Sequence, residues 1–160
     1  FENNSGIALN HIIGYGYAQL MRNGAGISST SGAAFAPANG VTISLQTLSS
    51  GIWYNTLNFS IRTTITATSS ASSDVIVNIA PMYGVRNGFG GAVKGGLDAF
   101  FYATANTAKQ LYDVYVEVTS ANTAKFLLTF IDGTTRYARW TDVSNGSARA
   151  ISVSCNIEVK

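Results

Sequence analysis

Residues 57–65 read LNFSIRTTI, a segment in which apolar and polar residues alternate almost without exception. Side chains in a β-strand point alternately to the two faces of its sheet, so residues two apart share a face. One face of this segment therefore carries Leu57, Phe59, Ile61 and Ile65. The other face carries Asn, Ser, Arg and Thr, and the segment predicts a half-buried strand with a polar outer surface.

The same alternation extends the prediction to four more segments, at 74–80, 112–119 and 151–159 and, more weakly, at 41–48. The residues expected to point inward are Val75, Val77 and Ile79; Tyr112, Val114, Val116 and Val118; Ile151, Val153, Cys155, Ile157 and Val159; and Val41, Ile43, Leu45 and Leu48. Half-buried strands of this kind are typical of sheets that cover a core on one side only.

Turn signals connect these strands. Asp132-Gly133 predicts a hairpin, and Asn145-Gly146 predicts a second hairpin onto the last strand, so that the final three strands form a meander. Asn39-Gly40 and Asn87-Gly88 mark further turns. The segment 7–21 fits either a helix or strands, and its two close glycines favour strands.

The predicted fold is an all-β, antiparallel, jelly-roll-like sandwich of about eight strands. We expect residues 1–160 to form one domain. Because the chain begins with Phe1 rather than Met, we further expect it to be the C-terminal part of a longer protein.

Charged residues make up 11% of the chain, against about 25% in typical soluble domains. A surface so poor in charge gains little solubility from charge repulsion, which favours a protein that buries part of itself in an oligomer. The ten Lys and Arg are scattered, so nucleic acid is not expected as a partner. No run of 18 apolar residues is present, so membrane insertion is not expected either.

Few residues offer catalytic chemistry. His11 is the only histidine, and an ordinary hydrogen-bonded role is expected for it rather than a metal or triad role. Cys155 is expected to be a buried, inert thiol. Asp113 and Glu117 stand about 13 Å apart along one strand. Glycosidase carboxylates are about 5 or 6.5–9.5 Å apart. We therefore predict no enzymatic activity, no metal and no cofactor.

The glycine-rich segment 88–96 lacks the spacing of a phosphate-binding loop, and it is expected to be a flexible surface loop. Aromatic residues are more informative. The neighbours Trp53 and Tyr54, near a strand start, should point to opposite faces, as should those of the run 100–102. Aromatic rings beside arginine can bind sugars, although a core or subunit-interface role is the alternative for each ring. The predicted glycan-binding residues are Trp53, Tyr54, Tyr83, Arg136 and Trp140.

The neutral composition rich in Ser, Thr, Asn and Gly, with an alternating final segment AISVSCNIEV at 150–159, resembles the C-terminal domains of bacteriophage tailspikes and tail fibres. The resemblance implies a homotrimeric β-sandwich at the distal end of a virion spike, which acts outside the cell and binds bacterial surface polysaccharide. In such proteins hydrolase or lyase activity belongs to a preceding β-helix. The resemblance therefore assigns no catalytic residue here.

Three other functions fit the sequence. The chain could be a carbohydrate-binding module of a secreted enzyme or a trimeric jelly-roll ligand of the tumour necrosis factor or complement C1q type. It could also be a small glycan-cleaving enzyme. Oligomeric mass separates the trimeric alternatives from the module, and cleavage of a polysaccharide panel identifies the enzyme.

Overall fold

The computed structural model describes residues 16–21, 32–94 and 111–159, and it confirms an antiparallel all-β fold. Eight strands have four or more residues: β1 (Gly16–Met21), β4 (Gln46–Trp53), β5 (Thr56–Ala67), β6 (Ile76–Ile79), β7 (Gly90–Lys94), β8 (Leu111–Ser120), β9 (Thr123–Phe130) and β11 (Arg149–Glu158). Three strands have three residues: β2 (Ala33–Phe35), β3 (Val41–Ile43) and β10 (Thr135–Tyr137). The helices are short: η1 (Pro81–Tyr83) and α3 (Trp140–Val143). No described helix could cross a bilayer.

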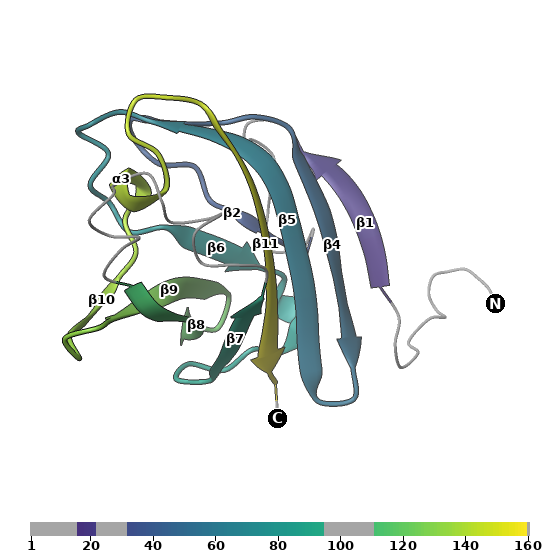
Figure 1. Cartoon of the computed structure of the whole chain (residues 1–160). Coiled ribbons are helices and arrows are strands. Elements are labelled where there is room, and N and C mark those ends of the chain that lie inside the picture. Colours follow the sequence, from purple (N-terminus) through teal and green to yellow (C-terminus); the bar gives the residue numbers. More distant parts are fainter. Residues whose placement is uncertain (1–15, 22–31, 95–110, 160) are drawn as a thin grey trace.

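The strands follow the order β1-β4-β5-β11-β7-β8-β9-β6-β2, with β3 beside β5 and β10 beside β9. This sheet curls back on itself, so that β1, β4, β5 and β11 form one layer and β8, β9 and β6 form the other (Figure 1). Strand β2 ends the order, yet it packs against β4 and β5. The apolar faces of the two layers therefore enclose one core.

The segment that predicts the fold lies at the centre of the first layer. Strand β5 pairs with β11 over ten residues, from Thr56 opposite Glu158 to Ile65 opposite Arg149. Every inward residue predicted in 57–65, 74–80 and 151–159 is buried, including Cys155, which is 1% exposed. The alternating pattern thus identifies the core correctly in these three strands.

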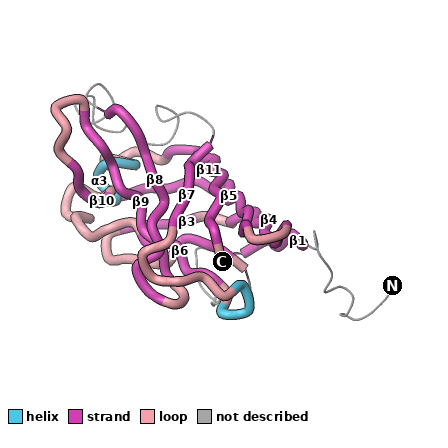
Figure 2. The backbone as a smooth tube through the Cα atoms, turned by 90° about the horizontal axis from the view of Figure 1, so that it is seen from below, coloured by secondary structure: helices cyan, strands magenta, loops and turns pink. Residues whose placement is uncertain are grey.

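Strand β7 joins the two layers, which corrects the prediction of a flexible loop at 88–96 for Gly90–Lys94, while residues 95–96 lie outside the described residues. Gly90 to Ala92 pair with β8, whereas Val93 and Lys94 pair with β11, so one short strand belongs to both layers (Figure 2). A Cβ atom on Gly91 would overlap the Asn156 carbonyl oxygen, and one on Gly90 would overlap that of Val116. Glycine is required here because no other residue lets the backbones approach so closely.

Two predicted strands differ in detail. The segment 41–48 is divided between β3 and β4, and Leu45, at the break, is 50% exposed rather than inward. Tyr112 is 73% exposed because the β8–β9 register shifts between Leu111 and Asp113, so Tyr112 has no partner in the ladder. An irregularity of this kind moves a side chain out of the alternation.

The predicted C-terminal meander is wrong in its last step. The hairpin at Asp132-Gly133 is present, since β10 pairs with β9. After β10, however, the chain forms α3 and crosses to the other layer, where β11 pairs with β5 and β7. Gly146 does occupy a turn, with φ of 83°, but this turn connects two layers and not two paired strands.

Strand β2 has a partner strand, β6, on one edge. At its other edge, the buried Gln46 side chain accepts a hydrogen bond from the Phe35 amide at 3.1 Å and donates one to the Phe35 carbonyl at 3.3 Å. These bonds satisfy both backbone groups of a strand end that lies inside the protein. They also tie β2 to the first residue of β4, across the core.

Candidate carbohydrate-binding face

Short polar side chains form rows across the outer face of β4, β5 and β11. Ser49 pairs with Ser60, and Ser60 pairs with Ser154, which gives a row of three hydroxyls. Side chains directly opposite one another on an antiparallel ladder lie about 5 Å apart, so such a row presents neighbouring hydrogen-bonding groups. The polar, outward-pointing side chains of residues 57–65 therefore continue as rows onto both adjacent strands, β4 and β11.

The next row consists of Gly51, Asn58 and Asn156. With the serines, the two asparagines line an open hollow of about 290 Å³, to which Phe59 and Cys155 also contribute. Gly51 has no side chain to fill the space beside Asn58. Hydroxyl and amide groups both donate and accept hydrogen bonds, as do the hydroxyl groups of a sugar.

Two exposed aromatic residues stand at one end of this face. Trp53 is 54% exposed and Tyr54 is 67% exposed. Their rings contact edge to face, with centroids 5.1 Å apart and planes at 86°. By strand alternation Trp53 lies on the same face as Ser49 and Gly51. The end of β4 thus places the backbone of Trp53 about 7 Å along the strand from the Gly51 row.

The prediction that Trp53 and Tyr54 point to opposite faces near a strand start is wrong. They lie at the end of β4, where Tyr54 and Asn55 form the two-residue turn that joins Trp53 to Thr56. Tyr54 has a φ of 56°, the only positive φ among the described residues other than glycine. This conformation costs a non-glycine residue about 1–2 kcal/mol. The favoured two-residue hairpin turns have positive φ at their first residue, so the turn accounts for this conformation.

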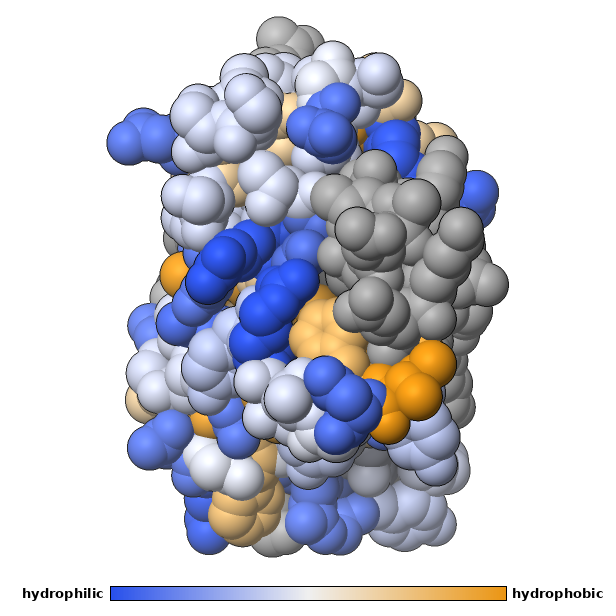
Figure 3. Space-filling view, turned by 60° about the vertical axis from the view of Figure 1, so that its left-hand side comes forward, coloured by the Kyte–Doolittle hydropathy of each residue, from blue (hydrophilic) through white to orange (hydrophobic). Residues whose placement is uncertain are grey.

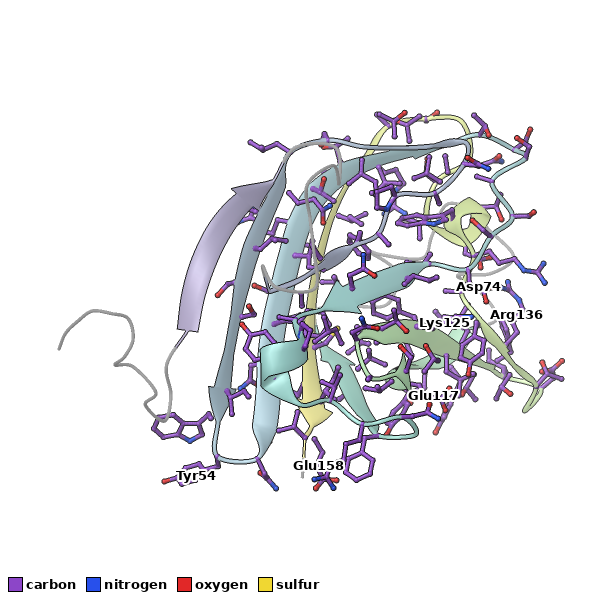
Figure 4. The ribbon with its side chains drawn as sticks, turned by 180° about the vertical axis from the view of Figure 1, so that it is seen from behind. Tyr54, Asp74, Glu117, Lys125, Arg136 and Glu158 are labelled. Atoms are coloured by element: carbon purple, nitrogen blue, oxygen red, sulfur yellow. The ribbon has the colours of Figure 1, made fainter. Side chains whose placement is uncertain are left out.

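Charged residues flank the polar hollow along the strands. Arg62 lies between Thr47 and Ser152, one row beyond the serines. Glu158 lies at the opposite end, in the row that also holds Trp53. Figure 4 shows Tyr54 and Glu158 near the same end of the layer. The face therefore runs from an aromatic and acidic end, across uncharged hydrogen-bonding groups, to a basic end.

Two of the predicted glycan-binding residues belong to the core. Trp140 is fully buried and contacts Phe35 edge to face, with ring centroids 5.6 Å apart. Tyr83 is 6% exposed, and its hydroxyl forms a 2.8 Å hydrogen bond with that of Ser50. Neither ring can be reached from the surface, so the prediction is corrected for both. Trp140 is the first residue of α3, and its side chain lies in the core.

Arg136 lies away from the aromatic pair, and Figure 4 shows it on the other side of the molecule from Tyr54. Its guanidinium donates two hydrogen bonds to the Asp142 carboxylate, at 2.7 and 2.8 Å, and lies over the Phe130 ring. Asp142 also accepts the Arg139 amide and holds the start of α3 in place. Arg136 is therefore occupied in fixing the link between β10 and α3.

Other charged groups on the second layer are also paired. Lys125 donates to Asp74 at 2.9 Å and lies over the Tyr137 ring, whose hydroxyl donates to Glu117. Figure 3 shows hydrophilic side chains gathered on this side of the molecule, beside hydrophobic ones. The charged and aromatic groups of this network are therefore engaged with one another.

Among the described residues, few side chains offer metal-binding or nucleophilic chemistry. No group of three or more His, Cys, Asp or Glu side chains within them could hold a metal ion. Burial raises the pKa of the Cys155 thiol far above its usual range, so the thiolate is scarce. His11 and the aromatic run 100–102 lie outside the described residues.

No protein-family model, curated protein or solved structure matches this chain. The candidate site therefore depends on its own geometry. Sequence reasoning found Trp53 and Tyr54 but missed the five polar residues of the hollow: Ser49, Asn58, Ser60, Ser154 and Asn156. The polar positions were visible in 57–65 and 151–159, but only the pairing of β5 with β11 and β4 shows that they are adjacent.

Proposed function

We propose that this chain is a non-catalytic, glycan-binding domain whose ligand lies on the outer face of β4, β5 and β11. The observation that carries the proposal is an exposed aromatic pair, Trp53 and Tyr54, at one end of the layer whose outer face holds a hollow lined by hydroxyls and amides. A flat ring binds the apolar face of a sugar by stacking, and the polar groups bind its hydroxyls.

The parent protein that we propose is a trimeric bacteriophage tailspike or tail fibre, which uses this domain to contact bacterial surface polysaccharide. The low charge and the exposed apolar side chains Tyr112 and Ile131, which are 73% and 70% exposed, support association between chains. Stacking on one ring contributes about 1 kcal/mol, so each site is weak. Three linked sites would supply avidity.

Binding to an array of bacterial polysaccharides, followed by titration of the best oligosaccharide, tests the proposal. Trp53→Ala should weaken the Kd about five-fold, the equivalent of about 1 kcal/mol, without loss of fold. Tyr115→Ala is the matched control, because it removes another exposed aromatic ring, 39% exposed, from the other layer. If both variants bind like the wild type, or if no glycan binds, the proposed site is wrong.

The oligomeric state is measured separately. Light scattering at micromolar concentration should give three times the chain mass of 16.9 kDa. A monomer mass would remove the trimer from the proposal and favour a free carbohydrate-binding module. Release of reducing sugar from a bound polysaccharide would instead favour the glycan-cleaving alternative.

A further inference from the structure

The charges that flank the hollow differ at its two ends, and this difference bears on the class of glycan. At one end of the hollow, Ser49, Ser60 and Ser154 form a row of hydroxyls. Arg62 occupies the adjacent row, two residues from Ser60 along β5. One basic residue therefore borders the serine row along the strand.

Arg62 is exposed, and no ion pair with another described residue engages its guanidinium. In contrast, Arg136 and Lys125 each pair with an aspartate. Two residues along a strand span about 7 Å, and the arginine side chain is long enough to reach over that distance toward Ser60. A planar guanidinium binds a carboxylate through two parallel hydrogen bonds.

At the opposite end Glu158 shares a row with Trp53 and Thr56. The negative charge of Glu158 disfavours an anionic sugar at this end. Stacking on the Trp53 indole ring requires no charge on the sugar, so an uncharged sugar fits there. The rows at Thr56 and Arg62 are six residues apart on β5, or about 20 Å, which accommodates a short oligosaccharide. Because Glu158 and Arg62 carry opposite charges at the two ends of this span, a bound glycan chain should adopt one orientation.

Building on the proposed function, we infer that the ligand is an acidic glycan, bound with a carboxylate at Arg62 and an uncharged sugar on Trp53. The hydroxyls and amides of the hollow bind the sugar units between these two ends. A neutral glycan would use the same hollow and ring but would lack the contact with Arg62. The contact with the exposed Arg62 thus distinguishes an acidic glycan from a neutral one.

The test uses an array of bacterial polysaccharides, each printed in its native form and after chemical reduction of its uronic carboxylates to neutral alcohols. Wild-type protein should bind acidic members and lose about five-fold in apparent affinity when their carboxylates are reduced, which is the upper range for an exposed ion pair. Arg62→Ala should reduce binding to the native form about as much and leave binding to the reduced form unchanged. The effect of Arg62 should diminish as salt rises.

Arg86→Ala is the matched control, since it removes an exposed arginine from the loop before β7 with the same change in net charge. Equal losses in the two variants would mean non-specific attraction and would overturn the inference. Binding that survives carboxylate reduction at full strength would also overturn it, while leaving the proposed function intact. Failure to bind any glycan, native or reduced, would overturn both.

Discussion

The Gln46 side chain bonds the Phe35 backbone as a neighbouring strand would, with one hydrogen bond to the amide and one to the carbonyl. Both residues are fully buried. One edge of β2 is thereby satisfied without a strand, and the two layers are linked at that point by a pair of polar contacts inside an apolar core. Buried backbone groups that lose such partners destabilise the fold because no water replaces the lost bonds.

Gln46→Ala is therefore expected to lower the free energy of unfolding by about 2–4 kcal/mol, the sum for two orphaned buried groups and a small cavity. Urea denaturation measures the change. Ser49→Ala, on the exposed face of the same strand, is the control and should change the stability by less than about 0.5 kcal/mol. Equal stability of Gln46→Ala and wild type would show that these bonds contribute nothing.

Gly91→Ala is expected to lower the stability of the fold more than glycine substitutions in turns do, because Gly91 lies in β7, which connects the two layers. The added methyl group would overlap the Asn156 carbonyl oxygen, so β7 or β11 would have to move. Gly84→Ala serves as the comparison, because Gly84 has a φ of 66° with open space around it. Its cost should be only the strain of the left-handed conformation, about 1–2 kcal/mol. Thermal melts that rank the two variants in the reverse order would contradict this view of β7.

The two tryptophans should respond in opposite ways to removal. Trp140→Ala deletes a fully buried ring and should destabilise the fold by about 3–5 kcal/mol. Trp53→Ala deletes an exposed ring and should change stability by less than about 0.5 kcal/mol. Denaturation followed by circular dichroism distinguishes them. A large loss of stability in Trp53→Ala would show that this residue is structural.

Tyr54→Gly should stabilise the hairpin and weaken binding at once. Glycine adopts a φ of 56° without the cost that tyrosine bears, so the free energy of unfolding should rise by about 1 kcal/mol. The loss of the ring should weaken glycan binding. Asn55→Gly in the same turn keeps the aromatic pair and is the control for binding. If Tyr54→Gly lowers stability, the strain at this residue is compensated by its contacts.

The Tyr137 hydroxyl provides a prediction about pH. The hydrogen bond to Glu117 and partial burial raise the pKa of Tyr137 above its usual value of about 10. The unfolded chain thus loses this proton first as pH rises. The contribution to stability is complete below pH 10 and declines above it, through the folded-state pKa. Urea denaturation at pH 8 and pH 11 should show a smaller alkaline loss for Tyr137→Phe than for wild type.

The sequence predicts the layers of this fold better than their connections. Alternation marks Leu57, Phe59 and Ile61 as inward because burial on one face requires a period of two. It does not show which strand lies beside which, so the crossing from β10 through α3 to β11 was not predicted. It also misassigns Tyr112, where an irregular register interrupts the period.

For the candidate site too, the sequence indicates local features but not which strands lie side by side. Trp53 could be recognised because it stands in a turn region, beside a second aromatic residue. The sequence marks Trp140 as a candidate as well, but Trp140 is fully buried and packs against Phe35. The polar hollow arises from the lateral register of three strands, and the most distant of them is about 100 residues along the chain from its partners. Such long-range register has no local signal in the sequence.

The central position of β11 has a consequence for how the chain reaches its native state. Strand β5 is complete at residue 67, but its main partner begins only at Arg149. During synthesis, one edge of β5 therefore has no partner strand until most of the chain has been made. Pairings between such distant segments form slowly, because a long loop must close before any contact is gained. We therefore expect the two layers to form slowly, and only after the last strand of the chain has been made.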